Sequence, residues 1–362
     1  MSDAVSAGSL FAGRLIMAPM TRGTDLPFRV LAHEQGAEVC LGEMAYAHKI
    51  VRGDKAERAL LRRDAREARF GVQLAGRDAE VMAEAARIAA DMGADFVDVN
   101  LGCPIDDATR RGFGAALLER PSRVGAIVAA MKRAVSIPVT VKLRLGWSDA
   151  KPTFLKIARA AEEAGADALA LHARSRAQRY RRAADWNRVA ELVAAARVPV
   201  IGNGDIFSWR DAVRRLEETG CAAVMVGRWA LAKPWIFREF LERRDLAPDP
   251  EARLAVLRRY VELCREHFGD DEHGRARTRR FLVFHQDFFR RFRPEGDGCG
   301  VNADDPREWG GEPRNDVEQW LCRGDLEAAE ALCRWLVDGG PAEPPPPAGP
   351  ETMRAVDAQA FG

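Results

Sequence analysis

Eight short apolar runs recur along the first part of the chain, and this repeat constrains the fold more than any other feature. Most of the runs are nearly continuous apolar stretches, as expected of parallel strands that are buried on both faces. Helical patterns lie between them, and several of these end near Gly or Pro. Strand–helix alternation repeated eight times predicts a (β/α)8 TIM barrel over residues 1–243. The eight runs are residues 15–20, 39–43, 70–74, 96–101, 139–144, 168–172, 198–202 and 223–227.

The sequence after the barrel predicts a smaller all-α domain at residues 251–337, which a Pro-containing linker separates from the barrel. Within that range, residues 294–315 are rich in Gly, Pro, Asp and Glu, which predicts a long loop. Residues 338–362 form a Pro-rich tail that we expect to be extended or disordered. A doubly wound open sheet is the alternative fold for the first part. It usually has fewer repeats, and no G-x-G-x-x-G motif follows an early strand here.

The composition limits the partners of the chain. Its 362 residues include 55 basic and 54 acidic side chains, so any nucleic-acid binding must come from local patches. Seven scattered cysteines indicate reduced thiols in a cytoplasm. We expect no signal peptide, no membrane association and a monomer. The Cys and His spacings match no standard zinc pattern, so we expect no metal site.

Polar residues gather where the apolar runs end. In a barrel all strand exits meet on one face, so these residues are expected to lie together. Buried polar groups without partners are costly, which suggests that a ligand supplies the partners. The set comprises Pro19, Met20, Gln73, Asn100, Cys103, Lys142, Arg144, His172, Arg174, Asn203, Gly204, Asp205, Gly227 and Arg228.

The last two strand exits are typical of a phosphate site. Gly204 and Gly227 allow backbone N–H groups to approach a ligand, a helix N-terminus follows, and Arg228 offers a charged fork. Lys142 and His172 would then face the ring portion of the ligand. This pattern favours flavin mononucleotide (FMN), whose reduced form carries negative charge that a lysine stabilises.

Each of these residues also has a structural interpretation. Lys142 could pair with Asp98 or Glu43 inside the barrel, His172 could be a hydrogen-bonded structural histidine, and the glycines could simply serve tight turns.

Ten short pieces of sequence follow one another from residue 15 to about residue 240. They are Ala18-Pro-Met20, Asp25-x-Pro-Phe-Arg29, Glu43-Met44, Val72-Gln-Leu74, Asn100-Leu-Gly-Cys-Pro104, Gly112-x-Gly-x-Ala-Leu-Leu118, Val141-Lys-x-Arg144, His172-Ala-Arg174, Asn203-Gly-Asp-Ile206 and Gly227-Arg228. In these pieces and their order the chain resembles the dihydrouridine synthase family, of the bacterial type.

The resemblance implies an oxidoreductase that uses FMN and NADPH to reduce the C5–C6 double bond of selected uridines in tRNA. It implies that Cys103 is the proton donor. It also implies that FMN is held by Pro19, Met20, Thr21, Gln73, Lys142, His172, Asn203, Gly204, Asp205, Gly227 and Arg228.

Cys103 fits this chemistry on independent grounds. Residues 96–101 predict a buried strand, and Gly102-Cys103-Pro104 forces a turn that delivers a thiol to the strand exit. Hydride addition at C6 of uracil leaves an enolate that needs a proton at C5, and a thiol is mostly protonated at neutral pH. NADPH would visit the same cleft before the RNA, which predicts ping-pong kinetics. The structural alternative is a small buried cysteine at a turn.

Basic segments of the sequence indicate an RNA substrate. Residues 273–293 carry seven arginines with phenylalanines interleaved, and the phenylalanines are better explained as the core of an amphipathic helix. Candidate substrate contacts are Asn100, Arg144, Arg174, Arg176, Arg279, Arg280, Arg290 and Arg291. Two alternatives remain open at this point. One is a flavin-dependent reductase or dehydrogenase of a free pyrimidine or dihydroorotate-like molecule, and the other is an RNA-binding protein without turnover.

Overall fold

The computed structural model describes residues 7–292, 315–323 and 326–339. Within these residues a nine-stranded parallel sheet closes on itself, because β2 pairs with both β1 and β4 while β1 also pairs with β9. This closure confirms the predicted barrel and excludes the open sheet. The strands are β1 (Leu15–Met17), β2 (Cys40–Leu41), β3 (Ala45–Tyr46), β4 (Phe70–Ala75), β5 (Phe96–Leu101), β6 (Val139–Arg144), β7 (Ala168–His172), β8 (Val200–Asn203) and β9 (Ala223–Val226).

The second barrel position differs from the single strand that the sequence predicts. It is divided into β2 and β3, and both pieces pair with β4. The interruption lies at Glu43, whose carboxylate turns to accept the backbone N–H of Arg22 at 2.7 Å. This contact joins the strand break to the loop that follows β1.

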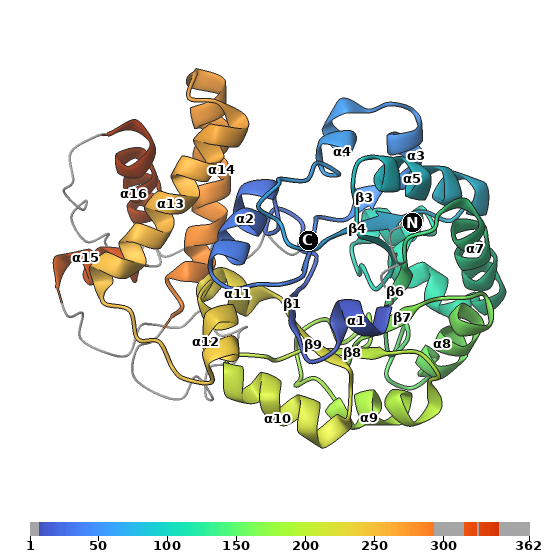
Figure 1. The fold of residues 1–362 in the computed structure, drawn as a ribbon. Helices are drawn as coiled ribbons and strands as arrows, with labels where there is room; N and C mark the ends of the chain where they lie inside the picture. The colour runs from blue at the N-terminus through green and yellow to red at the C-terminus, as the bar shows by residue number, and fades with distance from the viewer. Residues whose placement is uncertain (1–6, 293–314, 324–325, 340–362) are drawn as a thin grey trace.

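An outer layer of helices covers the barrel, as Figure 1 shows. Local capping explains where several of them begin. Asp78 accepts the N–H groups of Glu80 and Val81 at the start of α5, and Ser208 and Asp211 form a capping box at the start of α10. The layer includes α5 (Ala79–Asp91), α7 (Pro121–Ala134), α8 (Phe154–Glu163), α9 (Trp186–Ala195) and α10 (Trp209–Thr219).

Shorter helices occupy the loops of the barrel and its two ends. The sequence patterns did not identify them, because they are too brief to show a clear period. They are α1 (Ala7–Phe11), α2 (Leu26–Glu34), α3 (Ala47–Val51), α4 (Lys55–Ala59), α6 (Asp106–Arg110), the 3-10 helix η1 (Gly114–Glu119), α11 (Arg228–Ala232) and α12 (Ile236–Glu242).

In the described part of the chain after the barrel, four helices lie beside α2, α11 and α12 (Figure 1). We call them the C-terminal helices: α13 (Pro250–Phe268), α14 (Glu272–Phe289), α15 (Asp316–Leu321) and α16 (Leu326–Asp338). Phe281, Phe288 and Phe289 of α14 are buried, as the amphipathic interpretation of this segment predicts. The loop expected at 294–315 and the tail expected at 338–362 lie almost wholly outside the described residues.

Asp25 joins the barrel to the C-terminal helices. Its carboxylate caps α2 by accepting the N–H of Phe28 at 3.0 Å, and it also accepts the hydroxyl of Tyr260 on α13 at 2.8 Å. His285 of α14 lies 3.4 Å from the same carboxylate and packs its ring on Phe28. One buried acid therefore connects three helices.

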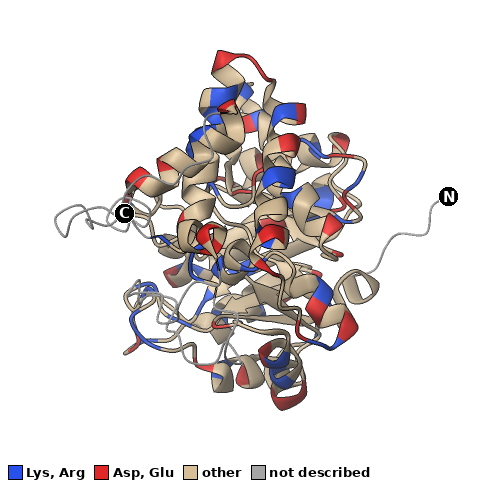
Figure 2. Ribbon diagram, turned by 90° about the vertical axis from the view of Figure 1, so that its left-hand side faces the viewer, with Lys and Arg blue, Asp and Glu red and all other residues tan. Residues whose placement is uncertain are grey.

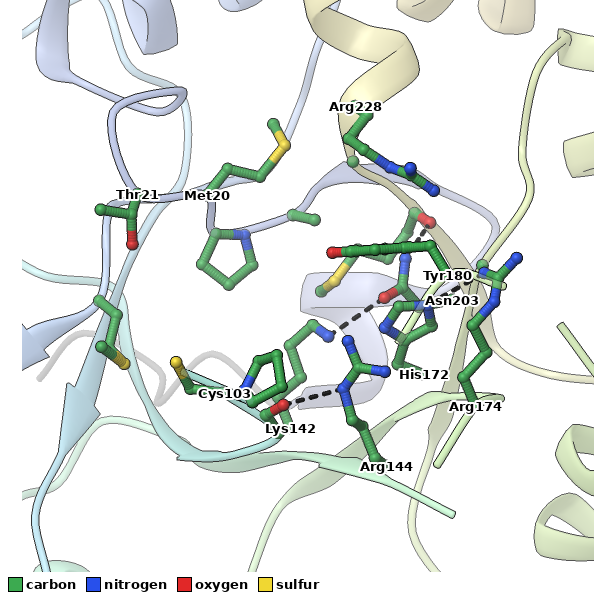
Figure 3. A pocket seen from close by; sticks show the side chains of 18 of the residues that line it. Met20, Thr21, Cys103, Lys142, Arg144, His172, Arg174, Tyr180, Asn203 and Arg228 are labelled. Carbon is green, nitrogen blue, oxygen red and sulfur yellow. Dashed lines mark hydrogen bonds between the residues drawn. The ribbon is translucent and has the colours of Figure 1, made fainter. Parts of the chain in front are cut away.

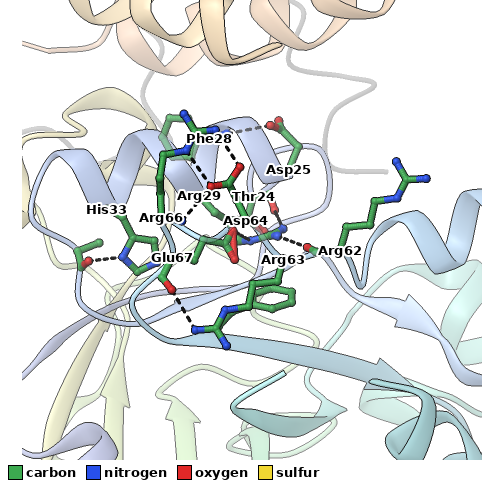
Figure 4. A network of polar contacts seen from close by, with 12 residues as sticks. Thr24, Asp25, Phe28, Arg29, His33, Arg62, Arg63, Asp64, Arg66 and Glu67 are labelled. Carbon is green, nitrogen blue, oxygen red and sulfur yellow. Dashed lines mark hydrogen bonds and ion pairs between the residues drawn. The ribbon is translucent and has the colours of Figure 1, made fainter. Parts of the chain in front are cut away.

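Arg29 ties the next loop to α2, as Figure 4 shows. Its guanidinium donates to Glu67 at 2.9 Å and to the carbonyl oxygens of Arg62 and Thr24. The same group lies 4.1 Å from the ring centroid of Phe70. Asp25, Phe28 and Arg29 of the Asp25-x-Pro-Phe-Arg29 piece therefore each make a capping or packing contact.

Candidate active site

A cleft opens where the barrel strands end at their carboxyl termini, the usual place for chemistry in this fold. It is lined by residues from the exits of seven strands, β1 and β4 to β9, together with residues of α14. All the residues expected to hold FMN lie in its wall, and so do Asn100, Cys103, Arg144 and Arg174. The residues expected from the sequence and found here are Pro19, Met20, Thr21, Gln73, Asn100, Cys103, Lys142, Arg144, His172, Arg174, Asn203, Gly204, Asp205, Gly227 and Arg228.

Cys103 lies in the cleft wall and not in the hydrophobic core. Figure 3 shows its thiol pointing into the cleft, with Met20 and Thr21 across from it. Asn100 Oδ1 accepts the backbone N–H groups of Gly102 and Cys103 at 3.1 and 2.9 Å, which fixes the turn. Burial raises the pKa of the Cys103 thiol, so the sulfur stays protonated at neutral pH.

Arg144 holds the same turn from the other side. Its Nε donates to the carbonyl oxygen of Gly102 at 2.9 Å, and its Nη1 donates to that of Ser175 at 3.1 Å. The guanidinium is buried, and burial lowers its pKa. Arg144 therefore has a positioning contact to the turn of Cys103 in addition to the substrate contact expected of it.

Cations crowd the wall beside Cys103. Lys142 Nζ donates to Asn203 Oδ1 at 3.1 Å, and among the described residues it forms no ion pair with Asp98 or Glu43. Burial lowers the pKa of Lys142, and the neighbouring Arg144 lowers it further. Burial also holds the pKa of His172 well below its usual range, and every charged neighbour that adds to this shift is a cation. Such a wall favours an anionic ligand.

The predicted phosphate end of the cleft contains two arginines with different partners. Arg174 pairs with Asp205, because its Nη2 donates to both carboxylate oxygens at 2.6 and 2.7 Å. The guanidinium of Arg228 lies 3.9 Å from the ring centroid of Tyr180. Gly204 has a φ of +127°, and a Cβ there would lie 2.6 Å from the Cβ of Ala184. The glycine is therefore required by the backbone of this turn.

Five of the arginines expected to contact the substrate do not line this cleft. Arg176 lies 4.6 Å from the ring centroid of Trp147, while Arg279 pairs with Asp338 at 2.7 Å. Arg290 and Arg291 both pair with Asp287. The fifth is Arg280, an exposed residue of α14. Figure 2 shows basic and acidic residues interspersed over the molecule, in keeping with these ion pairs.

Several residues of the cleft were missed by the sequence reasoning. Phe284 and Phe288 of α14 reach the cleft, so the C-terminal helices complete its wall. Their interleaving with arginines was visible in the sequence, but it indicated a helix core and not a cleft. Met44 enters from the break between β2 and β3, and Tyr180 from the loop after β7. Contacts of this kind depend on tertiary packing, which has no local sequence pattern.

Glu43, which precedes the cleft residue Met44, is expected to make the stability of the chain depend on pH. Burial raises its pKa to about 7, so the folded chain binds a proton there that the unfolded chain releases near pH 4.5. Stability from this group is therefore present at low pH and is lost as the pH rises to about 7. We expect Glu43→Gln to be more stable than the parent by up to about 3 kcal/mol at alkaline pH. Thermal melts at about pH 5 and about pH 8 measure this, and an equal effect at both would contradict it.

No group of three or more His, Cys, Asp or Glu side chains among the described residues is placed to hold a metal ion. None of the helices in that part of the chain is both long and apolar enough to cross a membrane.

Together these features define a (β/α)8-barrel protein with a cationic, thiol-bearing cleft at the carboxyl ends of its strands. The family model for dihydrouridine synthase (Dus) matches residues 16–296 of the chain. The chain belongs to the dihydrouridine synthase family.

Two curated relatives show which members of the family the chain is similar to. A tRNA-dihydrouridine(47) synthase of Cryptococcus neoformans var. neoformans serotype D is 42% identical over an alignment of 301 residues, and the match covers 78% of this chain and 42% of that protein. The Homo sapiens tRNA-dihydrouridine(47) synthase-like protein is 39% identical over 286 residues, with shares of 78% and 44%. The chain thus spans less than half the length of these relatives. Both are eukaryotic, so the family is confirmed but the expected bacterial type is not specifically supported.

Solved structures support the fold alone. Histamine dehydrogenase from Rhizobium sp. 4-9 superposes with a TM-score of 0.53 at 16% identity, covering 72% of this chain and 50% of the other. A 2-naphthoyl-CoA reductase gives a TM-score of 0.53 at 13% identity, with shares of 67% and 52%.

Proposed function

We propose that the chain is a tRNA-dihydrouridine synthase that reduces the C5–C6 double bond of uridine with FMN and NAD(P)H. The observation that carries the proposal is the convergence of the Cys103 thiol and a cationic wall on one cleft, in a chain of this family. We further propose uridine 47 as the target, because relatives that are 42% and 39% identical to the aligned part of the chain are named for that position.

The cleft has the features that FMN requires. Lys142, Arg144, Arg174 and Arg228 surround His172, and their combined positive charge favours an anionic ligand. Gly227 leaves its backbone open at the start of α11, where a Cβ would meet no atom closer than 3.6 Å. Arg228 at the same helix start would hold the phosphate, and Lys142 would offset negative charge on the ring system.

The proposed chemistry assigns a separate task to each side of the cleft. When bound, FMN supplies the hydride that adds to C6 of uracil. Cys103 holds a proton on Sγ and delivers it to C5, which leaves a thiolate that solvent reprotonates. Asn100 and Arg144 keep the turn of Cys103 fixed. Phe284 and Phe288 exclude water from the side of the C-terminal helices.

Reconstitution on unmodified tRNA tests the proposal. We expect the purified chain with FMN and NAD(P)H to form dihydrouridine at position 47, detected by mass-spectrometric mapping of the tRNA. The same mapping in cells with and without the gene checks the position. Turnover of free uracil without turnover of tRNA would instead support the small-molecule reductase, and tight tRNA binding without product would support the RNA-binding protein.

A further inference from the structure

Three buried side chains form a continuous path of hydrogen bonds from the barrel interior to the turn of Cys103. Gln73 Nε2 donates to Asp98 Oδ2 at 2.7 Å, and Asn100 Nδ2 donates to Gln73 Oε1 at 2.6 Å. Asn100 Oδ1 then accepts the backbone N–H of Cys103 at 2.9 Å. Asp98, Gln73 and Asn100 are 1%, 2% and 8% exposed, so solvent cannot easily replace these contacts.

The strand register places this path in the barrel. Gln73 of β4 and Asp98 of β5 are register partners, and Asp98 is in turn the partner of Thr140 on β6. The Thr140 hydroxyl donates to the second carboxylate oxygen, Asp98 Oδ1, at 2.6 Å. Asp98 thus accepts a hydrogen bond from each neighbouring strand. Gln73 in turn accepts a hydrogen bond from Asn100 and so links Asp98 to that residue.

The two ends of the path fix the orientation of both amides. An ionised carboxylate only accepts hydrogen bonds. The NH2 group of Gln73 must therefore face Asp98, and its carbonyl oxygen must face Asn100. A backbone N–H only donates, so the side-chain oxygen of Asn100 must face the N–H of Cys103. Both ends impose the same arrangement, and reversing either amide would place two donors or two acceptors in contact.

We propose that Asp98 is a positioning residue of the site, which acts through Gln73 and Asn100 to hold the turn that carries Cys103. The catalytic importance of the thiol in this inference rests on the proposed function. The hydrogen-bond path itself does not depend on that function. It changes the role expected of Asn100, because the carbonyl oxygen of that residue already accepts two backbone donors and is directed toward the turn and not toward a substrate.

A charge exchange tests the proposal. Gln73→Glu places two carboxylates in contact and breaks the path, whereas Asp98→Asn/Gln73→Glu restores it, because an amide at 98 can donate to a carboxylate at 73. We expect alkylation of Cys103 by iodoacetamide, followed on its own peptide by mass spectrometry, to rise about tenfold in Gln73→Glu and to return to within about twofold of the parent in the double variant. Additive effects of the two substitutions would overturn the proposal.

A second comparison keeps the test decisive if Gln73→Glu does not fold. Asp98→Leu removes the acceptor at the base of the path, while the matched control Thr140→Val removes one hydrogen bond to Asp98 and leaves the path intact. We expect faster alkylation of Cys103 in Asp98→Leu only, and equal rates in both variants would show that Asp98 acts by general stabilisation. Alkylation needs no turnover, so a chain that fails to reduce uridine would refute the proposed function without deciding this one.

Discussion

Cys103→Ala is expected to slow uridine reduction by on the order of 10²–10⁴ and to leave reduction of bound FMN by NAD(P)H unchanged. The thiol lies in the cleft, and burial raises its pKa, so the parent chain carries a proton where the enolate needs one. Alanine supplies no proton, whereas the step that reduces the flavin needs none at this place. Stopped-flow measurement of the two half-reactions separates these effects.

A matched control distinguishes the role of this thiol from a general effect of losing a cysteine. Cys221 lies outside the cleft and is buried beside Thr219, so Cys221→Ala should affect stability slightly and leave both half-reactions as in the parent. FMN content is measured on both variants, because a loss of cofactor would imitate a loss of turnover. Full uridine reduction by Cys103→Ala would remove the thiol from the mechanism.

The fold was largely predictable because the apolar runs report burial directly. Strands such as β7 and β9 are buried along their whole length, and this produces an almost continuous apolar pattern. The break between β2 and β3 was not predictable, since it depends on a contact between Glu43 and the distant Arg22. The position of α2 was not predictable for the same reason, because it depends on the hydrogen bond from the distant Tyr260 to Asp25 at the start of the helix.

The site was predictable where topology alone brings residues together. The carboxyl ends of parallel strands must converge, so Cys103, Lys142 and His172 could be placed on one face from their positions in the repeat. The partners of individual side chains could not be deduced in this way. Lys142 was equally able to pair with a carboxylate, and its contact with Asn203 depends on the closed geometry of the barrel. The arginines of residues 273–293 resembled an RNA surface, but Arg290 and Arg291, which directly follow α14, pair with Asp287 of that helix.

Loss of the buried ion pair of Arg29 and Glu67 should destabilise the chain strongly. The two side chains are 2% and 0% exposed, and Glu67 Oε2 has no hydrogen-bond partner among the described residues. Removing the guanidinium would therefore leave both carboxylate oxygens buried and unpaired. It would also leave the carbonyl oxygens of Arg62 and Thr24 without their donors.

We expect Arg29→Met to lower the free energy of unfolding by about 3–5 kcal/mol, because an uncompensated buried charge remains. Arg29→Met/Glu67→Met should recover part of this loss, since no charge is then left in the apolar interior. Denaturant titrations followed by circular dichroism measure both, and a loss below about 1 kcal/mol in the single variant would contradict the argument. The loop that Arg29 holds at Thr24 also carries Met20, whose N–H is hydrogen-bonded to the Thr24 hydroxyl at 3.1 Å. FMN affinity should therefore fall in the single variant even at temperatures where the chain stays folded.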